Sequence, residues 1–461
     1  MTRRTRRQML AATGTAIAGA LAGCGGVGDA VLGGDDDTLS YDHAALTDLA
    51  ERPPPTPPTA FPLSIPASAF DRHRSRIRAL LDEVPESPDL PNEALAAELA
   101  ERRSSVTDRF RDARGNETGP SGGSESEYLP DRTAPRERLG DLRSVRADAA
   151  GINAAYRAAI GRVDGEELRS RRERVRSDLY DFLRSWTYDG ASALEALLVH
   201  NHIEGLVESV RRSLREPASF PEAPRDEAFA VSDLAASVEY ARASLADATS
   251  LRGTYRESVA DPTSYRDAIE STAGRLVEQH RITSAHADVH EYEDLDEPPF
   301  ARSIEETPAG ELYRHARELV GDDFVEGRGL ERQPASRCLQ AAVGLAALQT
   351  FRTVVEEIDA GNYGVPETVA PIAEARGDAV DALRMVWTGE PQALRLELDW
   401  PATDMLLYQL REFHEDVADL DDGEVSTYTI NETYGGLLYA YHYATYVPPV
   451  ADHLLAVLRE Q

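Results

Sequence analysis

Apolar residues return every three or four positions along most of this chain, from about Phe70 to the C-terminus. The run Leu348, Phe351, Val355 and Ile358 is typical of the pattern, and alternating apolar runs of the kind that form strands are scarce. Prolines and glycines interrupt the pattern at intervals of about one helix length. The sequence therefore predicts an all-α protein, with helical bundles built from long antiparallel helical hairpins.

Two irregular stretches divide the helical pattern. Residues 115–130 are rich in Gly and Ser and predict a flexible loop, and an acidic, proline-containing run covers residues 291–308. We therefore expect one helical region at 67–297 and a second, more apolar one at 309–461. Residues 24–66 are Gly-rich and then Pro-rich, which predicts a disordered, lipidated tether ahead of the body.

The first 23 residues have the pattern of an export signal. Arg3, Arg4, Arg6 and Arg7 precede a weakly apolar, Ala- and Gly-rich run that ends at Cys24. The segment resembles a twin-arginine signal peptide, with Arg6 and Arg7 as the twin arginines, followed by a lipoprotein cleavage box. This resemblance implies cleavage before Cys24 and lipidation of its thiol, which would anchor the protein to the outer face of the cytoplasmic membrane.

The composition is strongly acidic and contains no lysine. The 81 Asp and Glu residues face 49 basic residues, all of them Arg, which gives a formal net charge of −32. Loss of the signal peptide, with its four arginines, lowers the charge to −36. Molar salt would screen the resulting repulsion, and the composition resembles that of proteins from salt-loving archaea. Such a surface argues against nucleic acid as a partner.

The absence of lysine also excludes several reaction classes. Phosphate-binding loops of the G-x-x-x-x-G-K type, pyridoxal Schiff bases and protein kinases all need that amine. The chain has neither an H-E-x-x-H motif nor a G-x-S-x-G motif. Carboxylate pairs carry no information in so acidic a chain, so we predict no catalytic residue.

Histidines provide the candidate metal ligands. His286 and His290 lie four residues apart, and Glu293 continues close to the same helical face, so these three residues could form half of a zinc or iron site. The alternative is an acidic, solvated face that carries two histidines. His200 and His202 point in opposite directions on a helix, which predicts a solvated His200 and a packed His202.

The C-terminal segment is rich in tyrosine. On a helix, Tyr439, Tyr443 and Tyr446 share one side, where they could form a ligand surface or pack between helices. Asn116 and Asn431 each begin an Asn-x-Thr acceptor pattern for glycosylation.

Cysteine offers little chemistry in the mature chain. With Cys24 committed to lipid, Cys338 has no partner for an intrachain disulfide. It stands at the start of an uncharged stretch, which predicts a small packed hydrophobe, the alternative being a reactive nucleophile.

These features favour a lipid-anchored protein that binds or scaffolds other envelope proteins at the cell surface rather than an enzyme. We predict no resident cofactor. One alternative is a metal- or haem-handling lipoprotein, similar in class to the imelysins, although the G-x-H-x-x-E motif of that family is absent. A second alternative is a hydrolase whose site is assembled from scattered residues.

Overall fold

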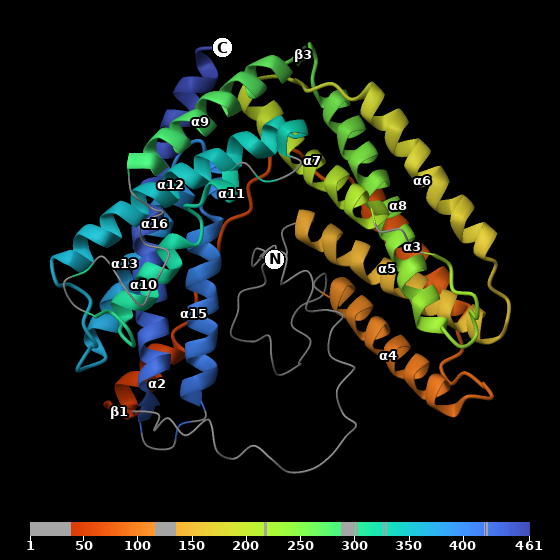
Figure 1. The fold of residues 1–461 in the computed structure, drawn as a ribbon, viewed down its shortest axis with the longest axis horizontal. Helices are drawn as coiled ribbons and strands as arrows, with labels where there is room; N and C mark the ends of the chain where they lie inside the picture. The colour runs from red at the N-terminus through yellow and green to blue at the C-terminus, as the bar shows by residue number, and fades with distance from the viewer. Residues whose placement is uncertain are drawn as a thin grey trace. The chain divides into compact units, whose positions relative to one another are not determined.

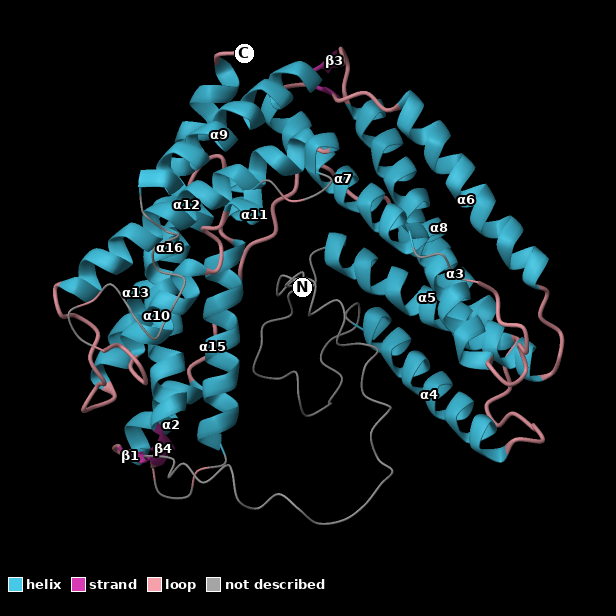
Figure 2. Ribbon diagram, viewed as in Figure 1, coloured by secondary structure: helices cyan, strands magenta, loops and turns pink. Residues whose placement is uncertain are grey.

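The computed structural model confirms the predicted all-α class. It describes residues 38–115, 135–215, 219–286, 300, 303–325, 327, 330–418, 420 and 423–461. Helices make up about three quarters of the described backbone (Figure 2). The first helices are α2 (His43–Glu51), α3 (Ala67–Asp82), α4 (Glu93–Gly115), α5 (Pro135–Ala159), α6 (Gly165–Ser185), α7 (Ala193–Arg215) and α8 (Ala228–Ser258).

The second group of helices begins after residue 265. It comprises α9 (Arg266–His286), α10 (Pro308–Arg317), α11 (Asp322–Val325), the 3₁₀ helix η2 (Leu330–Arg332), α12 (Pro334–Asp359), α13 (Ala370–Thr388), α14 (Gln392–Leu398), α15 (Trp400–Ala418) and α16 (Thr427–Arg459). Two short pairs of strands join distant parts of the chain: β1 (Thr38–Ser40) pairs with β4 (Glu424–Ser426), and β2 (Asp189–Gly190) pairs antiparallel with β3 (Thr263–Ser264).

Helices α3, α5 and α8 lie side by side at the centre of the first group (Figure 1). Their apolar faces, with that of α4, form one core, and α6 and α7 form a second core against α8. Small residues let α5 and α8 approach closely. A Cβ added at Gly151 of α5 would lie 2.7 Å from the Oγ of Ser232 on α8, so any larger residue would push these helices apart.

Helix α12 is the centre of the second group. It packs against α9, α10 and α16 in the largest core. It is also long and apolar enough to cross a membrane, but 72% of its most apolar window is buried inside the body, as in the core helix of a folded protein. Because α9 belongs to this core, the domain boundary that we expected between 297 and 309 falls instead before α9.

The predicted tether is shorter than expected. The N-terminal arm, residues 39–66, packs on the body rather than extending away from it. Its helix α2 buries Leu46 and Leu49 in the core of the second group, and the Tyr41 hydroxyl donates to the Pro366 carbonyl at 2.7 Å. Arg376 donates to two carbonyls of the arm, at Arg52 and Pro53. The expectation of a tether over residues 38–66 is therefore wrong, and residues 24–37 lie outside the described part.

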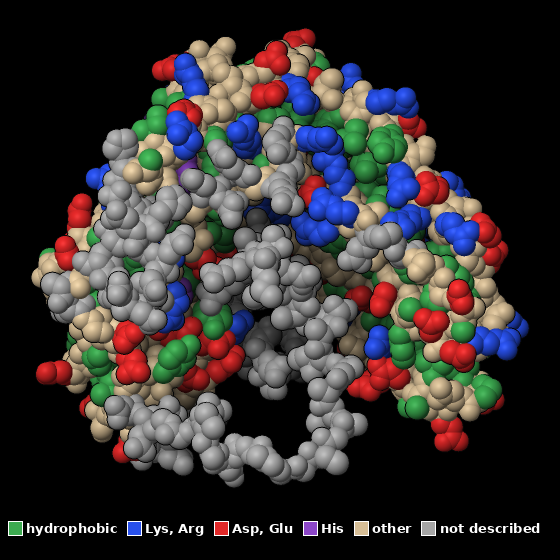
Figure 3. Space-filling view, in the orientation of Figure 1, with side chains coloured by type: hydrophobic (Ala, Val, Ile, Leu, Met, Phe, Trp, Pro, Cys, Tyr) green, Lys and Arg blue, Asp and Glu red, His purple; other side chains and the backbone are tan. Residues whose placement is uncertain are grey.

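Acidic and arginine side chains are interspersed on the face drawn in Figure 3. Many form pairs three or four residues apart on one helix, such as Arg281 with Glu278 and Arg176 with Glu173. Exposed pairs of this kind contribute little stability each. The more informative charges are therefore the ones buried between helices.

Candidate functional site

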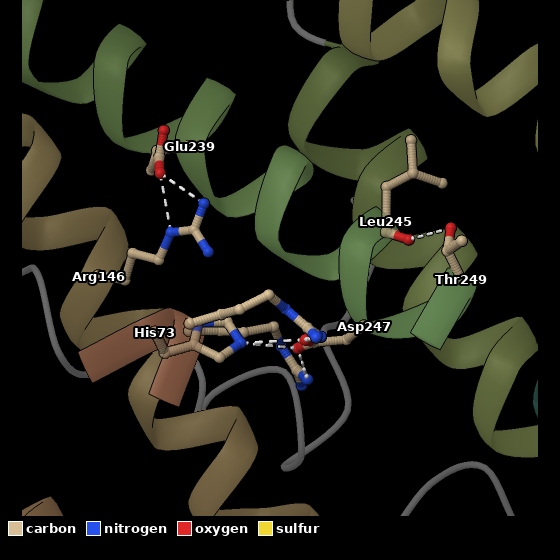
Figure 4. Close-up of polar contacts among 8 residues, drawn as sticks. His73, Arg146, Glu239, Leu245, Asp247 and Thr249 are labelled. Carbon is tan, nitrogen blue, oxygen red and sulfur yellow. Dashed lines mark hydrogen bonds and ion pairs between the residues drawn. The ribbon is translucent and has the colours of Figure 1, made fainter. Parts of the chain in front are cut away.

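Two carboxylates of α8 lie buried between α3 and α5. Asp247 and Glu239 are eight residues apart, which places them two turns apart on one face of the helix. Figure 4 shows His73 directed at Asp247 and Arg146 directed at Glu239. We call Asp247, Glu239, His73, Arg143 and Arg146 the buried charged cluster.

Asp247 is the most enclosed member of this cluster. Its side chain is fully buried, and the His73 Nε2 lies 3.0 and 3.1 Å from its two carboxylate oxygens. Arg143 Nη1 donates to Oδ2 at 3.1 Å, and Arg72 on α3 approaches to 3.9 Å. Three cationic or polar groups from two other helices therefore converge on one carboxylate, which links α8 to both neighbours.

Glu239 is surrounded by guanidinium groups. Arg146 donates through Nε at 2.8 Å, and the Nε of Arg76 and the Nη1 of Arg242 lie at 3.3 and 3.5 Å. Burial by itself would raise the pKa of Glu239, but Arg146 and Arg76 hold that pKa below its usual value. Burial lowers the pKa of Arg146, and the nearby charges of Arg242 and Arg76 lower it further.

A histidine held by a carboxylate is also the pair that orients a general base in many hydrolases. Here His73 is only 1% exposed and Asp247 is fully enclosed, so a substrate has no direct approach to either group in this conformation. The geometry instead fits a structural role, in which opposite charges fix the positions of three helices.

A second buried carboxylate joins the two groups of helices. Glu204 of α7 accepts hydrogen bonds from the backbone N–H groups of Ala335 and Ser336, at the start of α12, at 3.0 and 2.6 Å. The Tyr188 hydroxyl donates to the same carboxylate at 2.7 Å. Burial raises the pKa of Glu204, although these hydrogen bonds act against the increase. Glu204 thus supplies the N-terminal cap that the sequence of α12 lacks.

The prediction for the neighbouring histidine was wrong. His200, expected to be solvated, is buried beside Glu204, where Trp186 Nε1 donates to its Nδ1 at 3.1 Å and the Asp189 carbonyl lies 3.1 Å from its Nε2. Burial lowers the pKa of His200 to about 4. His202, expected to pack, is half-buried with its ring 5.4 Å from that of Phe61. Residue spacing showed that the two rings point apart but could not show which side of α7 the second group covers.

A further carboxylate bridges the same two groups of helices. Glu397 of α14 forms an ion pair with Arg136 at the start of α5, and Asn201 of α7 lies 3.4 Å from its second oxygen. Two residues later, Asp399 is buried, with Trp387 Nε1 and the Thr403 hydroxyl donating to its Oδ2 at 2.5 and 3.1 Å. Burial raises the pKa of Asp399 to about 7.

This pKa leads to a prediction about stability and pH. An unfolded aspartate titrates near pH 4, so between about pH 4 and 7 the folded protein holds a proton that the unfolded chain has released. The stabilisation from this proton is complete below that range and is lost as the pH rises through 7, to a total of about 4 kcal/mol. Between pH 5 and pH 8 the uncharged Asp399→Asn variant should gain about 3 kcal/mol in free energy of unfolding relative to the wild type, in denaturant titrations at molar salt.

The carbonyl oxygen of the new asparagine can accept from both Trp387 and Thr403, because both donors already share one oxygen. The control is Asp381→Asn, which changes an exposed aspartate paired with Arg384. This control should change the free energy of unfolding by the same amount at pH 5 and at pH 8. If the free energies of unfolding of Asp399→Asn and the wild type differ by the same amount at pH 5 and pH 8, the pKa of Asp399 is not raised by burial.

The predicted tyrosine surface is not a surface. Tyr439 and Tyr443 are buried in the core, where the Tyr443 hydroxyl lies 3.2 Å from the Leu398 carbonyl. Tyr446 is half-buried, with its hydroxyl 2.5 Å from that of Thr353. The helical spacing was correctly identified, but all three residues serve packing between helices, so the expectation of a ligand surface is wrong.

Two further sequence expectations concern buried residues. Asn431 is only 2% exposed and donates to the Glu306 carbonyl at 2.6 Å, so the folded protein has no room for a glycan there and that prediction is wrong. Cys338 is fully buried, and burial raises the pKa of its thiol far above the usual range. Cys338 is therefore the packed hydrophobe, and the nucleophile alternative is wrong.

Other predicted positions lie outside the described residues: Arg6, Arg7, Cys24, Asn116, His290 and Glu293. His286 is the last residue of α9, and only its backbone is described. Among the described residues, no group of three or more His, Cys, Asp or Glu side chains is arranged to hold a metal ion. The metal site at His286, His290 and Glu293 stays a prediction.

Two family models match successive parts of the chain. Residues 68–261 match a family model described as a domain of unknown function (DUF8262), and residues 263–456 match a second, described as a domain of unknown function (DUF8264). No curated protein and no solved structure matches the chain. The first match covers nearly all of α3 to α8 and the second runs from β3 into α16, so Glu204 and Glu397 each link the two matched regions.

Proposed function

We propose that this protein is a lipid-anchored, extracytoplasmic protein that acts by binding or scaffolding envelope proteins. The observation that carries the proposal is that the buried carboxylates of the protein connect its helices to one another. Asp247, Glu239, Glu204 and Glu397 each join helices, and Asp247 is closed off from substrate. A body whose buried polar groups fix its shape suits a role in presenting a surface.

The export segment supplies the location in this proposal. Its arginine cluster, weakly apolar run and Cys24 support secretion followed by lipidation. The N-terminal arm supports a role in anchoring, because α2 is packed into the core of the second group of helices. A pull on the lipid would therefore be transmitted to the folded body through this arm.

The anchor can be tested with the two cysteines of the chain. We expect the wild type to enter the detergent phase on phase separation and Cys24→Ser to enter the aqueous phase, since loss of the acyl chains removes the membrane affinity. Cys338→Ser is the matched control. It changes the other cysteine, which is buried in the core, and should leave the protein in the detergent phase.

Mass spectrometry of the mature N-terminus gives an independent result. We expect an acylated cysteine as the first residue. An intact residue 1, or a Cys24→Ser variant that stays in the lipid fraction, would disprove the anchor.

The scaffolding role requires a separate measurement. After mild detergent extraction in molar salt, the wild type is expected to sediment in a complex with envelope proteins that is larger than a single chain. A wild-type chain that sediments alone, at every extraction condition that keeps it folded, would remove the scaffolding part of the proposal while leaving the anchor untouched.

A further inference from the structure

The region around the buried charged cluster holds more positive than negative charge. Asp247 and Glu239 are the two carboxylates at its centre. Five guanidinium groups lie within 4 Å of them, those of Arg72, Arg76, Arg143, Arg146 and Arg242. In a chain with a net charge of −32, a local surplus of arginine stands out against the composition.

Neighbouring carboxylates reduce this surplus only in part. The charge of Asp141 acts on Arg143 and also on Arg109, a further arginine that is itself paired with Asp148. Asp141 and Asp148 add two negative charges to the count, and Arg109 adds one positive charge. Six arginines then face four carboxylates, so the surplus remains positive.

The arginines repel one another. Burial is the main cause of the lowered pKa of Arg146, Glu239 acts against it, and the charges of Arg242 and Arg76 lower that pKa further. The cluster also holds buried polar atoms without a partner, of which the Nε–H of Arg143 is a donor. Among the described residues, the Nε of Arg143 and the Nδ1 of His73 have no hydrogen-bond partner, although both side chains are about nine-tenths or more buried. A bound anion would relieve the repulsion.

The outer edge of the cluster is open to solvent. Arg72 and Arg76 lie one turn apart on α3, with side chains 43% and 32% exposed, and Arg242 on α8 is 57% exposed. The Nε of Arg76 and the Nη1 of Arg242 each lie within 3.5 Å of an oxygen of Glu239. These two nitrogens are therefore at most about 9 Å apart, and both donate to Glu239, so an oxyanion at this edge would accept from the other N–H groups of the two guanidinium ions.

We propose that Arg72, Arg76 and Arg242 form the mouth of an oxyanion site that binds a phosphate group, either free inorganic phosphate or the phosphate of a lipid headgroup. Arginine is suited to this ligand because its planar fork donates two parallel hydrogen bonds to phosphate oxygens. The proposed site lies within residues 68–261, the region matched by the first family model, and does not depend on the anchor at Cys24.

Equilibrium dialysis of the purified Cys24→Ser protein against labelled inorganic phosphate, in molar sodium chloride at pH 7.5, tests the first source. We expect saturable binding of one phosphate per chain. The double variant Arg76→Gln with Arg242→Gln should bind at least tenfold more weakly. Arg242→Gln alone should bind several-fold more weakly, and it keeps the fold because its side chain is exposed.

The matched control changes two arginines outside the cluster. Arg169→Gln with Arg176→Gln removes the same charge from α6, where each arginine pairs with a single exposed glutamate, and should leave phosphate binding unchanged. A similar loss in this control would show that net charge, and not the cluster, governs binding.

Flotation with vesicles tests the second source. The Cys24→Ser protein is mixed with phosphatidylglycerol vesicles or phosphatidylcholine vesicles in the same salt. Flotation that the Arg76→Gln, Arg242→Gln variant abolishes assigns the site to a headgroup, and dialysis binding without flotation assigns it to free phosphate. The proposal is overturned if the Cys24→Ser protein with both arginines intact neither binds phosphate in dialysis nor floats with vesicles. It is also overturned if the Arg76→Gln, Arg242→Gln variant binds phosphate and vesicles as well as that protein does.

Discussion

Replacing Asp247 by asparagine is expected to lower the free energy of unfolding by about 3 to 5 kcal/mol, the largest effect that the described residues predict for a single polar substitution. The asparagine is nearly the same size but carries no charge. It would leave the guanidinium of Arg143, whose side chain is 10% exposed, buried without its counter-charge, and it would weaken the contact with His73. Denaturant unfolding in molar salt measures the difference directly.

The control for this substitution is Asp148→Asn on α5. Asp148 also pairs with an arginine, Arg109, but its side chain is 33% exposed, so water can replace the lost partner. Exposed pairs of this kind contribute at most about 1 kcal/mol. If the two variants lose the same stability, Asp247 is not the enclosed charge that the geometry indicates.

Replacing Glu204 by glutamine is expected to destabilise the protein by about 2 to 4 kcal/mol. The carboxylate accepts three hydrogen bonds, from Tyr188, Ala335 and Ser336, through both of its oxygens. Glutamine keeps one oxygen and places an N–H₂ group where the other oxygen stood. At least one buried donor then faces another donor, and α12 loses the negative charge at its N-terminus.

Glu208, one turn further along α7, is the matched control. It accepts hydrogen bonds from Gln333 at 3.1 Å and from Arg215 at 3.3 Å, in a half-buried position where water can replace a lost partner. Glu208→Gln should therefore cost less than about 1 kcal/mol. If Glu204→Gln and Glu208→Gln lose the same amount of stability, the contact between the two groups of helices does not depend on the cap that Glu204 provides for α12. Hydrogen exchange of the Ala335 and Ser336 amides should increase in Glu204→Gln and not in the control.

These two substitutions separate two layers of organisation. Asp247 acts inside the first family domain, between α3, α5 and α8, whereas Glu204 acts between that domain and the second one. If both predictions are confirmed, buried carboxylates stabilise both the first group of helices and its joint with the second. Any binding surface that spans the two domains would then have a fixed shape.

The helical class was predictable because it depends on local spacing. A helix brings residues three and four positions apart onto one face, so the apolar stripe of α12 is visible in the sequence without knowledge of its neighbours. The arm was missed for a related reason. Leu46, Leu49 and Ala50 form a short apolar stripe, but the surrounding glycines and prolines dominate the composition of residues 24–66.

The buried carboxylates could be anticipated only in part. Glu204 stands in a long apolar run, LLVHNHIEGLV, and Asp247 stands among alanines and serines, so each is an isolated acid in an apolar setting. In a chain with 81 acidic residues, however, isolated acids are expected on solvated faces as well. The partners that other helices supply to these buried carboxylates, His73, Arg143 and Arg146, come from positions 93 to 174 residues away, beyond the reach of any local pattern.

The order of residues along this chain is therefore sufficient to establish its helical class and its acidic, lysine-free chemistry, because each of these depends on composition or on neighbours within a few positions. The enclosure of Asp247, Glu204 and His200 depends on which helices pack together. That packing results from the summed burial of many apolar side chains over long sequence separations, so the same residue types could equally have faced solvent.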